Sequence, residues 1–353
     1  MTLPYLAYAN SEPDISASYK VSNEDFQVQE VLSFEPDGEG DHLFLYLEKN
    51  GLTTQDVQGQ LMQYFNLSAK DVSFSGMKDK QALTQQWFSV KQESREVPET
   101  RELNSEQLTV QRAIRNKRKL KRGSHRSNQF SIRLRDLSAK PDGLIERINR
   151  ISLEGFPNYF GEQRFGKNQD NVVKAKQLFD GTLKFKGRYQ QGIYISAARA
   201  YLFNKVLSRR VEDGSWNTYL SGDLMSLDGT SSCFKPDKWD QVLSDRLDKK
   251  DIHPTGPMWG SGALLSEDLC AALELDLVKN EAALKSGLEQ IGLDQERRAL
   301  RSMPRGLNYA IEDNSTILIQ FSLSKGAYAT ALLRELVKLR PLNNDPAMSA
   351  GAL

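Results

Sequence analysis

The chain has 353 residues, of which 39% are hydrophobic and 26% are charged. This composition is typical of a globular protein and excludes a disordered chain. The length is enough for two domains, or for one large domain with an insertion.

The formal net charge of +1 conceals a strong asymmetry along the chain. Residues 1–106 carry 8 basic and 18 acidic side chains, a net charge of −10, whereas residues 107–135 carry 10 basic and no acidic ones. Residues 155–303 are nearly balanced, with 21 basic and 20 acidic side chains. A binding partner meets this local field and not the overall charge.

Cysteine and histidine are few and scattered along the sequence. The two cysteines are Cys233 and Cys270, and the three histidines are His42, His125 and His253. Without a Cys-x-x-Cys or His-x-x-x-His pair, neither a zinc site nor a disulfide framework is expected, and a reducing cytoplasm is favoured. The N-terminus lacks the basic and apolar regions of a signal peptide, and the sequence predicts no membrane span and a frayed tail at 343–353.

Short alternating segments dominate the first half of the chain. Thr53 is placed to cap a helix that carries Val57, Leu61 and Phe65 on one face. The alternation predicts strands at 26–31, 42–47, 87–90 and 130–135, with an acidic linker at 93–106. Strands with intervening helices indicate an α+β domain built on a mixed, mainly antiparallel sheet.

Helical periodicity takes over from about residue 155. It predicts helices at 169–179, 195–213 and 264–284, with Gly and Pro punctuating 221–262. A predicted strand at 317–323 and a predicted helix at 327–339 then return to the pattern of strands and helices in the first half of the chain. We therefore predict an inserted domain at 155–303 within a discontinuous domain formed by 1–154 and 304–353.

The segment from Ser73 to Trp87 contains a candidate catalytic acid. It reads Ser-Phe-Ser-Gly-Met-Lys-Asp-Lys-Gln-Ala-Leu-Thr-Gln-Gln-Trp, so Asp79 follows a glycine turn and lies between Lys78 and Lys80. Neighbouring cations favour the ionised carboxylate that a nucleophile or base requires. A Lys-Asp-Lys turn is equally compatible with a solvated surface loop.

A dense basic block follows at 112–126, reading Arg-Ala-Ile-Arg-Asn-Lys-Arg-Lys-Leu-Lys-Arg-Gly-Ser-His-Arg. A solvated loop and a targeting signal are alternative interpretations. An unrelieved run of like charges repels itself unless an anion neutralises it, and docking on phosphate releases condensed counterions. The block therefore favours a nucleic-acid partner.

Three further motifs stand at wide spacing. Asn23-Glu-Asp-Phe-Gln-Val-Gln-Glu30 and Lys325-Gly-Ala-Tyr-Ala-Thr330 are each compatible with a plain cap-plus-strand or helix start. Asn158-Tyr-Phe-Gly-Glu-Gln-Arg-Phe-Gly166 suits a tight turn with close backbone approach, in which Arg164 suits phosphate or a buried acid. It also suits a domain junction with aromatic anchors.

Together, in this order, the four motifs resemble the tRNA pseudouridine synthase D family over residues 20 to 335. Two positions depart from the family pattern, Ser75 before the glycine and Leu323-Ser324 before the last motif. The resemblance implies conversion of one uridine to pseudouridine in tRNA, at position thirteen of the D arm in bacterial members. It also implies a pseudouridine-synthase catalytic domain with an inserted α/β TRUD domain, and neither cofactor nor metal. We expect a cytoplasmic monomer.

The resemblance assigns roles to individual residues. Asp79 matches the catalytic aspartate, which either attacks C1′ or removes the C2′ proton. Lys20 is the candidate salt-bridge partner, ahead of Lys78 and Lys80, whose side chains are expected to diverge from the site. The resemblance gives three substrate-contacting aromatic residues and one polar contact: Phe26, Phe130, Tyr328 and Asn128. The expected RNA-binding residues are Lys117, Arg118, Lys119, Lys121, Arg122, Arg126 and Arg164.

Two alternatives from other classes use the same residues. A catalytically silent RNA-binding or RNA-chaperone protein would need only the basic block and the aromatics. A metal-dependent nuclease would use acids such as Asp25, Glu30 and Asp79, and its activity would require Mg²⁺.

Overall fold

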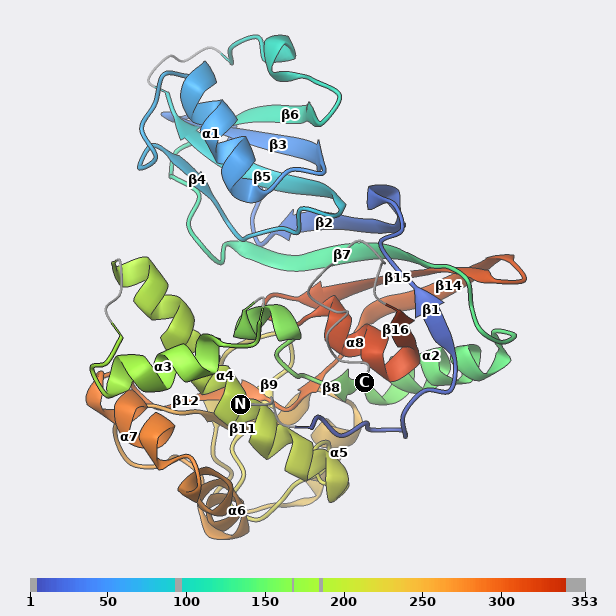
Figure 1. Ribbon diagram of the computed structural model, residues 1–353, viewed down its shortest axis with the longest axis vertical. Helices are drawn as coiled ribbons and strands as arrows, with labels where there is room; N and C mark the ends of the chain where they lie inside the picture. The colour runs from blue at the N-terminus through green and yellow to red at the C-terminus, as the bar shows by residue number, and fades with distance from the viewer. Residues whose placement is uncertain (1–4, 93–96, 167, 184–186, 341–353) are drawn as a thin grey trace.

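An eight-stranded sheet runs through the computed structural model, which describes residues 5–92, 97–166, 168–183 and 187–340 (Figure 1). The predicted tail at 343–353 lies outside these residues. In spatial order the strands are β14 (Arg305–Asp313), β15 (Thr316–Ser324), β7 (His125–Leu134), β2 (Phe26–Leu32), β5 (Leu83–Lys91), β3 (His42–Asn50) and β6 (Leu108–Asn116), with β4 (Val72–Phe74) paired to β5. Only the β2–β5 pair is parallel among these pairs, which confirms the predicted α+β class with a mixed, mainly antiparallel sheet.

Helix α1 (Thr54–Tyr64) covers one end of this sheet and forms where its cap predicts. The Thr53 hydroxyl accepts from the backbone N–H of Asp56, and the Asp56 carboxylate accepts from the N–H of Thr53. The helix buries Val57 and Leu61 in one hydrophobic cluster with the inward side chains of β3 and β5. The alternating apolar residues of β3 thus pack against the apolar residues of α1 that recur every four positions.

Helices α2 (Asp142–Glu154) and α8 (Ala329–Leu336) lie at the other end of the sheet, beside β14 and β15. The predicted helix at 327–339 is too long: Val337 is extended, and β16 (Lys338–Arg340) pairs in parallel with β1 (Ser16–Ser18). The backbone N–H of Lys338 donates to the Ile15 carbonyl at 2.9 Å, so a non-local strand pair ends the helix. Helical periodicity does not reveal a partner about 320 residues away.

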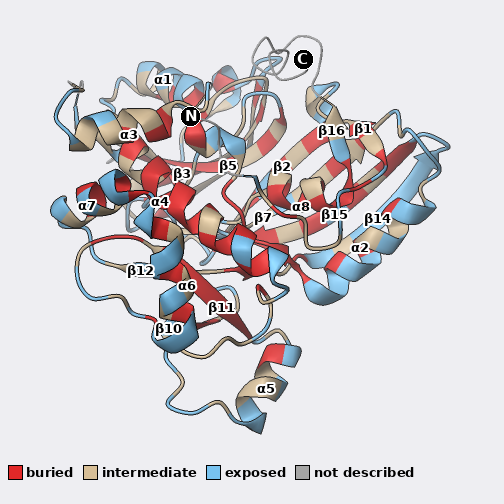
Figure 2. Ribbon diagram, turned by 60° about the horizontal axis from the view of Figure 1, so that its bottom comes forward, coloured by how far each residue is buried: buried red, intermediate tan, exposed pale blue. Residues whose placement is uncertain are grey.

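The segment 155–303 begins and ends on a short antiparallel pair, β8 (Phe156–Pro157) with β13 (Arg301–Ser302). Its long helix α4 (Arg188–Glu212) packs against α3 (Asn171–Phe179), α6 (Asp268–Lys279) and α7 (Ala282–Gln290), so the predicted helix at 264–284 is in fact two helices. One hydrophobic cluster runs from β7 and β15 through α8 to α4 (Figure 2). The two parts share a core, and the boundaries at 155 and 303 stay a prediction.

A small sheet occupies the Gly- and Pro-rich stretch 221–262, where the sequence pattern predicts no element. Its order is β10 (Cys233–Phe234), β9 (Met225–Leu227), β11 (Ile252–Met258) and β12 (Glu296–Ala299), with α5 (Gln241–Asp248) beside it. Gly256 is needed within β11 because a Cβ there would lie 2.9 Å from Leu300 and 3.1 Å from Phe203. Glycine here permits close packing and does not mark a turn.

Three short 3₁₀ turns complete the described elements: η1 (Asn23–Asp25), η2 (Arg101–Leu103) and η3 (Glu162–Phe165). Within the described ranges, no helix combines the length and apolarity needed to cross a membrane.

Candidate active site

The register of the sheet gathers the site on one face. Val28 lies opposite Phe130 and Thr84, Phe130 lies opposite Phe321, and Thr84 lies opposite Lys49. Residues directly opposite on paired strands share a face, so these five side chains belong to the same side of the sheet. It is also the side that α1 and α8 cover at its two ends. The site therefore lies between the two helices.

The turn that carries Asp79 follows β4 and is held from beneath by the sheet and α1. The backbone N–H of Lys78 donates to the buried Thr54 hydroxyl at 2.9 Å, and the side-chain amide of Gln86 donates to the Gly76 carbonyl. The Thr54 hydroxyl in turn donates to the side-chain oxygen of Gln86, Oε1, at 3.1 Å. This bonded frame fixes the backbone, whereas the Asp79 side chain keeps 32% of its surface exposed.

Lys20 forms the ion pair with Asp79 that the resemblance predicts. Its Nζ lies 2.9 Å from the Asp79 Oδ2 and 4.2 Å from the centroid of the Phe26 ring. Lys20 also has a positive φ of 56°, a left-handed conformation that costs energy in a non-glycine residue. The backbone thus adopts a disfavoured conformation at the residue that brings an ammonium to the carboxylate.

Lys49 is a second lysine beneath Asp79, and it is not among the site residues predicted from the sequence. Its side chain is buried, and its Nζ donates to the backbone carbonyls of Asp79 at 2.8 Å and Leu52 at 2.6 Å. Burial lowers the pKa of this ammonium to about 8, against the opposing attraction of the Asp79 carboxylate. The signal was a charged residue at an inward position of β3, two residues after Leu47.

Lys78 turns away from Asp79, as expected for the flanking lysines. Its Nζ lies 2.9 Å from the fully buried Glu30 carboxylate and donates to the Asn128 Oδ1 at 2.6 Å. Burial raises the pKa of Glu30, while Lys78 opposes that shift. Lys80 is exposed. Because Lys78 occupies the Asn128 oxygen, the amide nitrogen of Asn128 is the atom left to contact a ligand.

The predicted aromatic residues of the sheet lie together. The rings of Phe26 and Phe130 meet edge to face at 6.2 Å, and Phe130 stacks on Phe321 at 5.2 Å. Phe321 was not predicted as a site residue; its position opposite Phe130 depends on strand register. The buried Asp25 carboxylate binds Arg133 and Arg135, and this ties the start of β2 to β7 beside Phe26.

Tyr328 and Arg164 form a separate group. The Arg164 Nη2 donates to the Tyr328 hydroxyl at 2.5 Å, and its Nη1 donates to Ser196 at 2.9 Å. The Tyr328 ring lies 5.8 Å from Phe160. Arg164 thus belongs with Tyr328 at the start of α8 and not with the basic block.

The basic block spans the end of β6, the loop that follows and the start of β7, and it lies beside the Asp79 turn. The backbone N–H of Gly123 donates to the Ser75 carbonyl at 2.8 Å, and the Arg122 guanidinium lies 3.7 Å from the Phe74 ring centroid. The buried Leu120 anchors the loop in a cluster with Phe44. All six predicted RNA-binding residues of the block are exposed: Lys117, Arg118, Lys119, Lys121, Arg122 and Arg126.

The remaining charged contacts of the block are local. Lys117 pairs with Glu39 at 2.7 Å on the surface, and the Lys119 ammonium donates to the Lys70 carbonyl. Arg115 differs from its neighbours, because it is buried within β6 and donates to the Gln92 carbonyl at 2.8 Å. Arg115 is therefore structural.

The acids of the nuclease alternative do not form a metal site. Asp25 binds two arginines, Glu30 binds Lys78, and Asp79 binds Lys20, so each carboxylate has its own cation. Across the part of the chain that the structure describes, no group of three or more His, Cys, Asp or Glu side chains could hold a metal ion.

A hollow of about 460 Å³ lies on the opposite face of the sheet. Amide and hydroxyl side chains such as Gln27, Gln85, Gln129 and Ser131 line it. It lacks the carboxylate paired with lysine that the other face presents. The face that carries Asp79 is therefore the candidate active site.

An exposed carboxylate paired with lysine, an aromatic floor and a basic loop together define the class: an enzyme that acts on a nucleic acid. Comparison with known proteins gives the family. The family model described as tRNA pseudouridine synthase D (TruD) matches residues 3–185 and 170–336. The chain therefore belongs to the tRNA pseudouridine synthase D family.

Individual relatives agree over nearly the full length. The chain is 38% identical over 340 residues to a tRNA pseudouridine synthase D of Hydrogenovibrio crunogenus, covering 96% of this chain and 98% of the relative. It is 41% identical over 336 residues to one of Methylococcus capsulatus, covering 95% of each. A solved TruD structure from Methanosarcina mazei superposes with a TM-score of 0.75 over 97% of this chain and 99% of that one, at 20% identity, and supports the fold.

Proposed function

We propose that Asp79 is the catalytic carboxylate of this enzyme and acts on a uridine extruded from tRNA. Membership of the family makes the chain an isomerase that converts uridine to pseudouridine in tRNA. The observation that carries the assignment to Asp79 is its 2.9 Å ion pair with Lys20 beside the Phe26 ring. We further propose that the target is the thirteenth position, in the D arm.

The reaction requires a carboxylate that stays ionised beside RNA. The N1–C1′ bond must break, the uracil must turn, and C5 must bond to C1′, after which C5 loses a hydrogen and N1 gains one. Asp79 serves as the nucleophile at C1′ or as the base that takes the C2′ proton, and both roles need the anion. RNA phosphates disfavour that anion, and the Lys20 ammonium opposes them.

The neighbouring side chains support the base once it has left the stack. Extrusion costs about a few kcal/mol, which stacking on an aromatic side chain offsets. Phe130, backed by Phe321, and Phe26 supply an aromatic surface, and Tyr328 supplies a further ring. Asn128, held through its oxygen by Lys78, presents an amide donor suited to a uracil carbonyl.

Substitution of Asp79 by Asn tests this assignment. Asp79→Asn keeps the shape of the side chain and removes the charge, so we expect loss of pseudouridine formation, measured as tritium released from C5-labelled tRNA, with tRNA binding retained. Asp237→Asn, on an exposed loop, is the matched control and should turn over normally. Normal turnover by Asp79→Asn would overturn the role of Asp79. If the pseudouridine that the variant fails to form lies at another position of the tRNA, the D-arm target would be wrong.

A further inference from the structure

We propose that Arg298 and Arg301 line a binding pocket for an RNA phosphate, next to the target-base site. The pocket has a volume of about 270 Å³ and lies between β12, the β9–β10 turn and the β15–α8 loop. The proposal rests on the proposed function, because it assigns a second contact to the same tRNA. It adds a part of the inserted segment to the RNA-binding surface.

Arg298 is a cation with only neutral partners. Its Nη2 donates to the Asn158 side-chain oxygen at 2.6 Å and to the Gly326 carbonyl at 2.9 Å, and its guanidinium lies 4.1 Å from the Phe160 ring centroid. Burial lowers the pKa of this guanidinium to about 10, so it remains charged at neutral pH. Its Nη1 has no hydrogen-bond partner among the described residues.

Arg301, three residues further along in β13, repeats the pattern. Its Nε donates to the His253 Nδ1 at 2.9 Å, and its Nη2 donates to the backbone carbonyls of Leu247 and Ile252. It has no carboxylate partner within the described ranges. Burial lowers the pKa of Arg301 to about 10 as well, so it too is charged.

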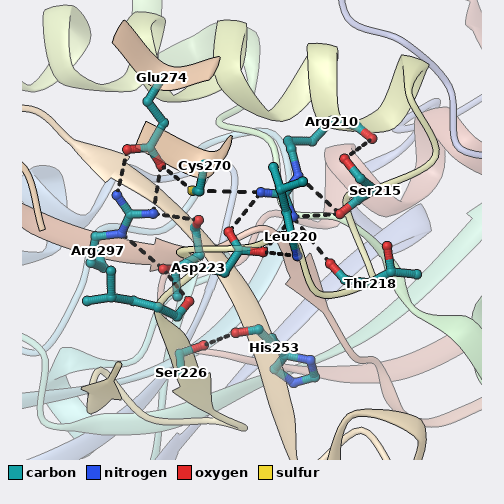
Figure 3. A network of polar contacts seen from close by, with 12 residues as sticks. Arg210, Ser215, Thr218, Leu220, Asp223, Ser226, His253, Cys270, Glu274 and Arg297 are labelled. Atoms are coloured by element: carbon teal, nitrogen blue, oxygen red, sulfur yellow. Dashed lines mark hydrogen bonds and ion pairs between the residues drawn. The ribbon is translucent and has the colours of Figure 1, made fainter. Parts of the chain in front are cut away.

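Two arginines of the same segment whose side chains are almost fully buried do have acids. Arg210 pairs with Asp223, and Arg297 pairs with Glu274, in the network that Figure 3 shows. A buried cation without an anion is costly, because desolvation is not offset by attraction. The contrast between Arg297 and its neighbour Arg298 indicates that the compensating charge at the pocket comes from a ligand.

The one acid that lines the pocket, Asp228, is already paired. Its Oδ1 lies 3.0 Å from the His253 Nε2, and its Oδ2 lies 2.9 Å from an Arg305 nitrogen. Arg297 also lines the pocket but is paired with Glu274, and Lys325 adds a third cation that has no carboxylate partner among the described residues. The pocket therefore keeps a net positive field, and guanidinium groups suit phosphate because they present parallel N–H donors.

The β15–α8 loop connects this pocket to the basic block. The backbone N–H of Lys325 donates to the Arg126 carbonyl, and the Lys325 Nζ donates to the Gly123 carbonyl. The carbonyl of the next residue, Gly326, accepts from the Arg298 Nη2. Two residues later comes Tyr328, which binds Arg164. An RNA strand bound to the basic block can thus extend past the target base and place one of its phosphates at Arg298. A free anion would bind in the pocket without contacting the basic block.

Salt-dependent binding tests the pocket. In an Asp79→Asn background, which keeps the tRNA unmodified, Arg298→Met should weaken tRNA binding by about tenfold or more. It should also lower the slope of log K against log salt by about 0.7 to 0.9, as expected for one lost phosphate contact. Arg209→Met, which removes an exposed arginine of α4 paired with Asp213, is the matched control and should change neither value.

A second measurement keeps the test decisive if Arg298→Met does not fold. In the unaltered protein, tRNA should protect Arg298 from phenylglyoxal, and millimolar inorganic phosphate should protect it less. An unchanged salt slope or an unprotected Arg298 would overturn the pocket. Protection by phosphate alone, without protection by tRNA, would overturn the RNA source. Retained turnover by Asp79→Asn would instead contradict the proposed function. The binding results could still be interpreted, because they do not depend on catalysis.

Discussion

Three lysines surround the Asp79 turn, and the structure gives each a different task. Lys20 meets the carboxylate, Lys49 binds the backbone carbonyl of the same residue, and Lys78 binds Glu30 and Asn128. Of these three, Lys78 is the one that adjoins Asp79 in sequence, and it is the one that points away. Charge at a reactive group thus depends on where side chains converge and not on their order along the chain.

Lys49 predicts a basic limit to activity. Burial lowers its pKa to about 8, so the ammonium loses its proton as pH rises through that value, and the positive charge beneath Asp79 is lost. We expect kcat/KM, which reports the free enzyme, to fall above pH about 8. In Lys49→Met the charge is absent at every pH, so activity should be lower and this limb should disappear. Identical limbs in both proteins would contradict the assignment.

The motifs singled out Asp79, and its need for a nearby cation singled out Lys20, just upstream of the first motif, but Lys49 and Phe321 stayed outside the prediction. Lys49 comes from β3 and Phe321 from β15, and neither lies in one of the four motifs. They reach the site through the pairings Lys49 with Thr84 and Phe321 with Phe130. Strand register places them, and register depends on long-range packing that local pattern does not encode.

At the scale of the element, prediction succeeded where local signals decide the structure. The Thr53 cap and the buried spacing of Val57 and Leu61 marked α1. Prediction failed at the end of α8, where the chain leaves the helix to pair as β16 with β1. It also failed in β11, whose glycine and proline residues are buried in a strand and do not form turns. Local propensity is a weak prior that tertiary contacts override.

The start of α1 also supports the turn that carries Asp79, because the hydroxyl of Thr54, the first helical residue, accepts from the N–H of Lys78. Thr53→Ala removes the acceptor for the Asp56 N–H and should destabilise the protein by about 1 kcal/mol. Chemical unfolding measures the loss, and Thr53→Ser, which keeps the hydroxyl, is the control. Equal stability of Thr53→Ala and Thr53→Ser would show that the cap contributes nothing.

At the scale of the whole molecule, the N-terminal segment joins the two parts of the chain. The N–H of Ala7 donates to Ser208 on α4, and Arg334 on α8 donates to the Leu6 carbonyl at 2.7 Å. The N–H of Ala9 donates to the buried Glu335 carboxylate at 3.0 Å. The N-terminal segment thus contacts both α8, which follows the sheet, and α4, the long helix of the segment 155–303.

Glu335 makes the stability of this junction depend on pH. Burial raises its pKa to about 7, from 4.5 for an unperturbed glutamate, although Arg334 opposes the shift. Between these values the folded chain binds more protons than the unfolded chain, so the free energy of unfolding falls as pH rises from about 4.5 to 7. The slope from one such group is at most about 1.4 kcal/mol per pH unit.

Glu335→Gln should remove this dependence, because the amide stays neutral while its oxygen can still accept from Ala9. We expect the stability of the variant relative to the unaltered protein to rise between pH 5 and pH 8, by about 1 to 3 kcal/mol, as urea unfolding would measure. Glu12→Gln, in the same segment but exposed beside Lys338, is the matched control and should follow the unaltered protein. Parallel curves for Glu335→Gln and the unaltered protein would mean that Glu335 stays ionised across this range.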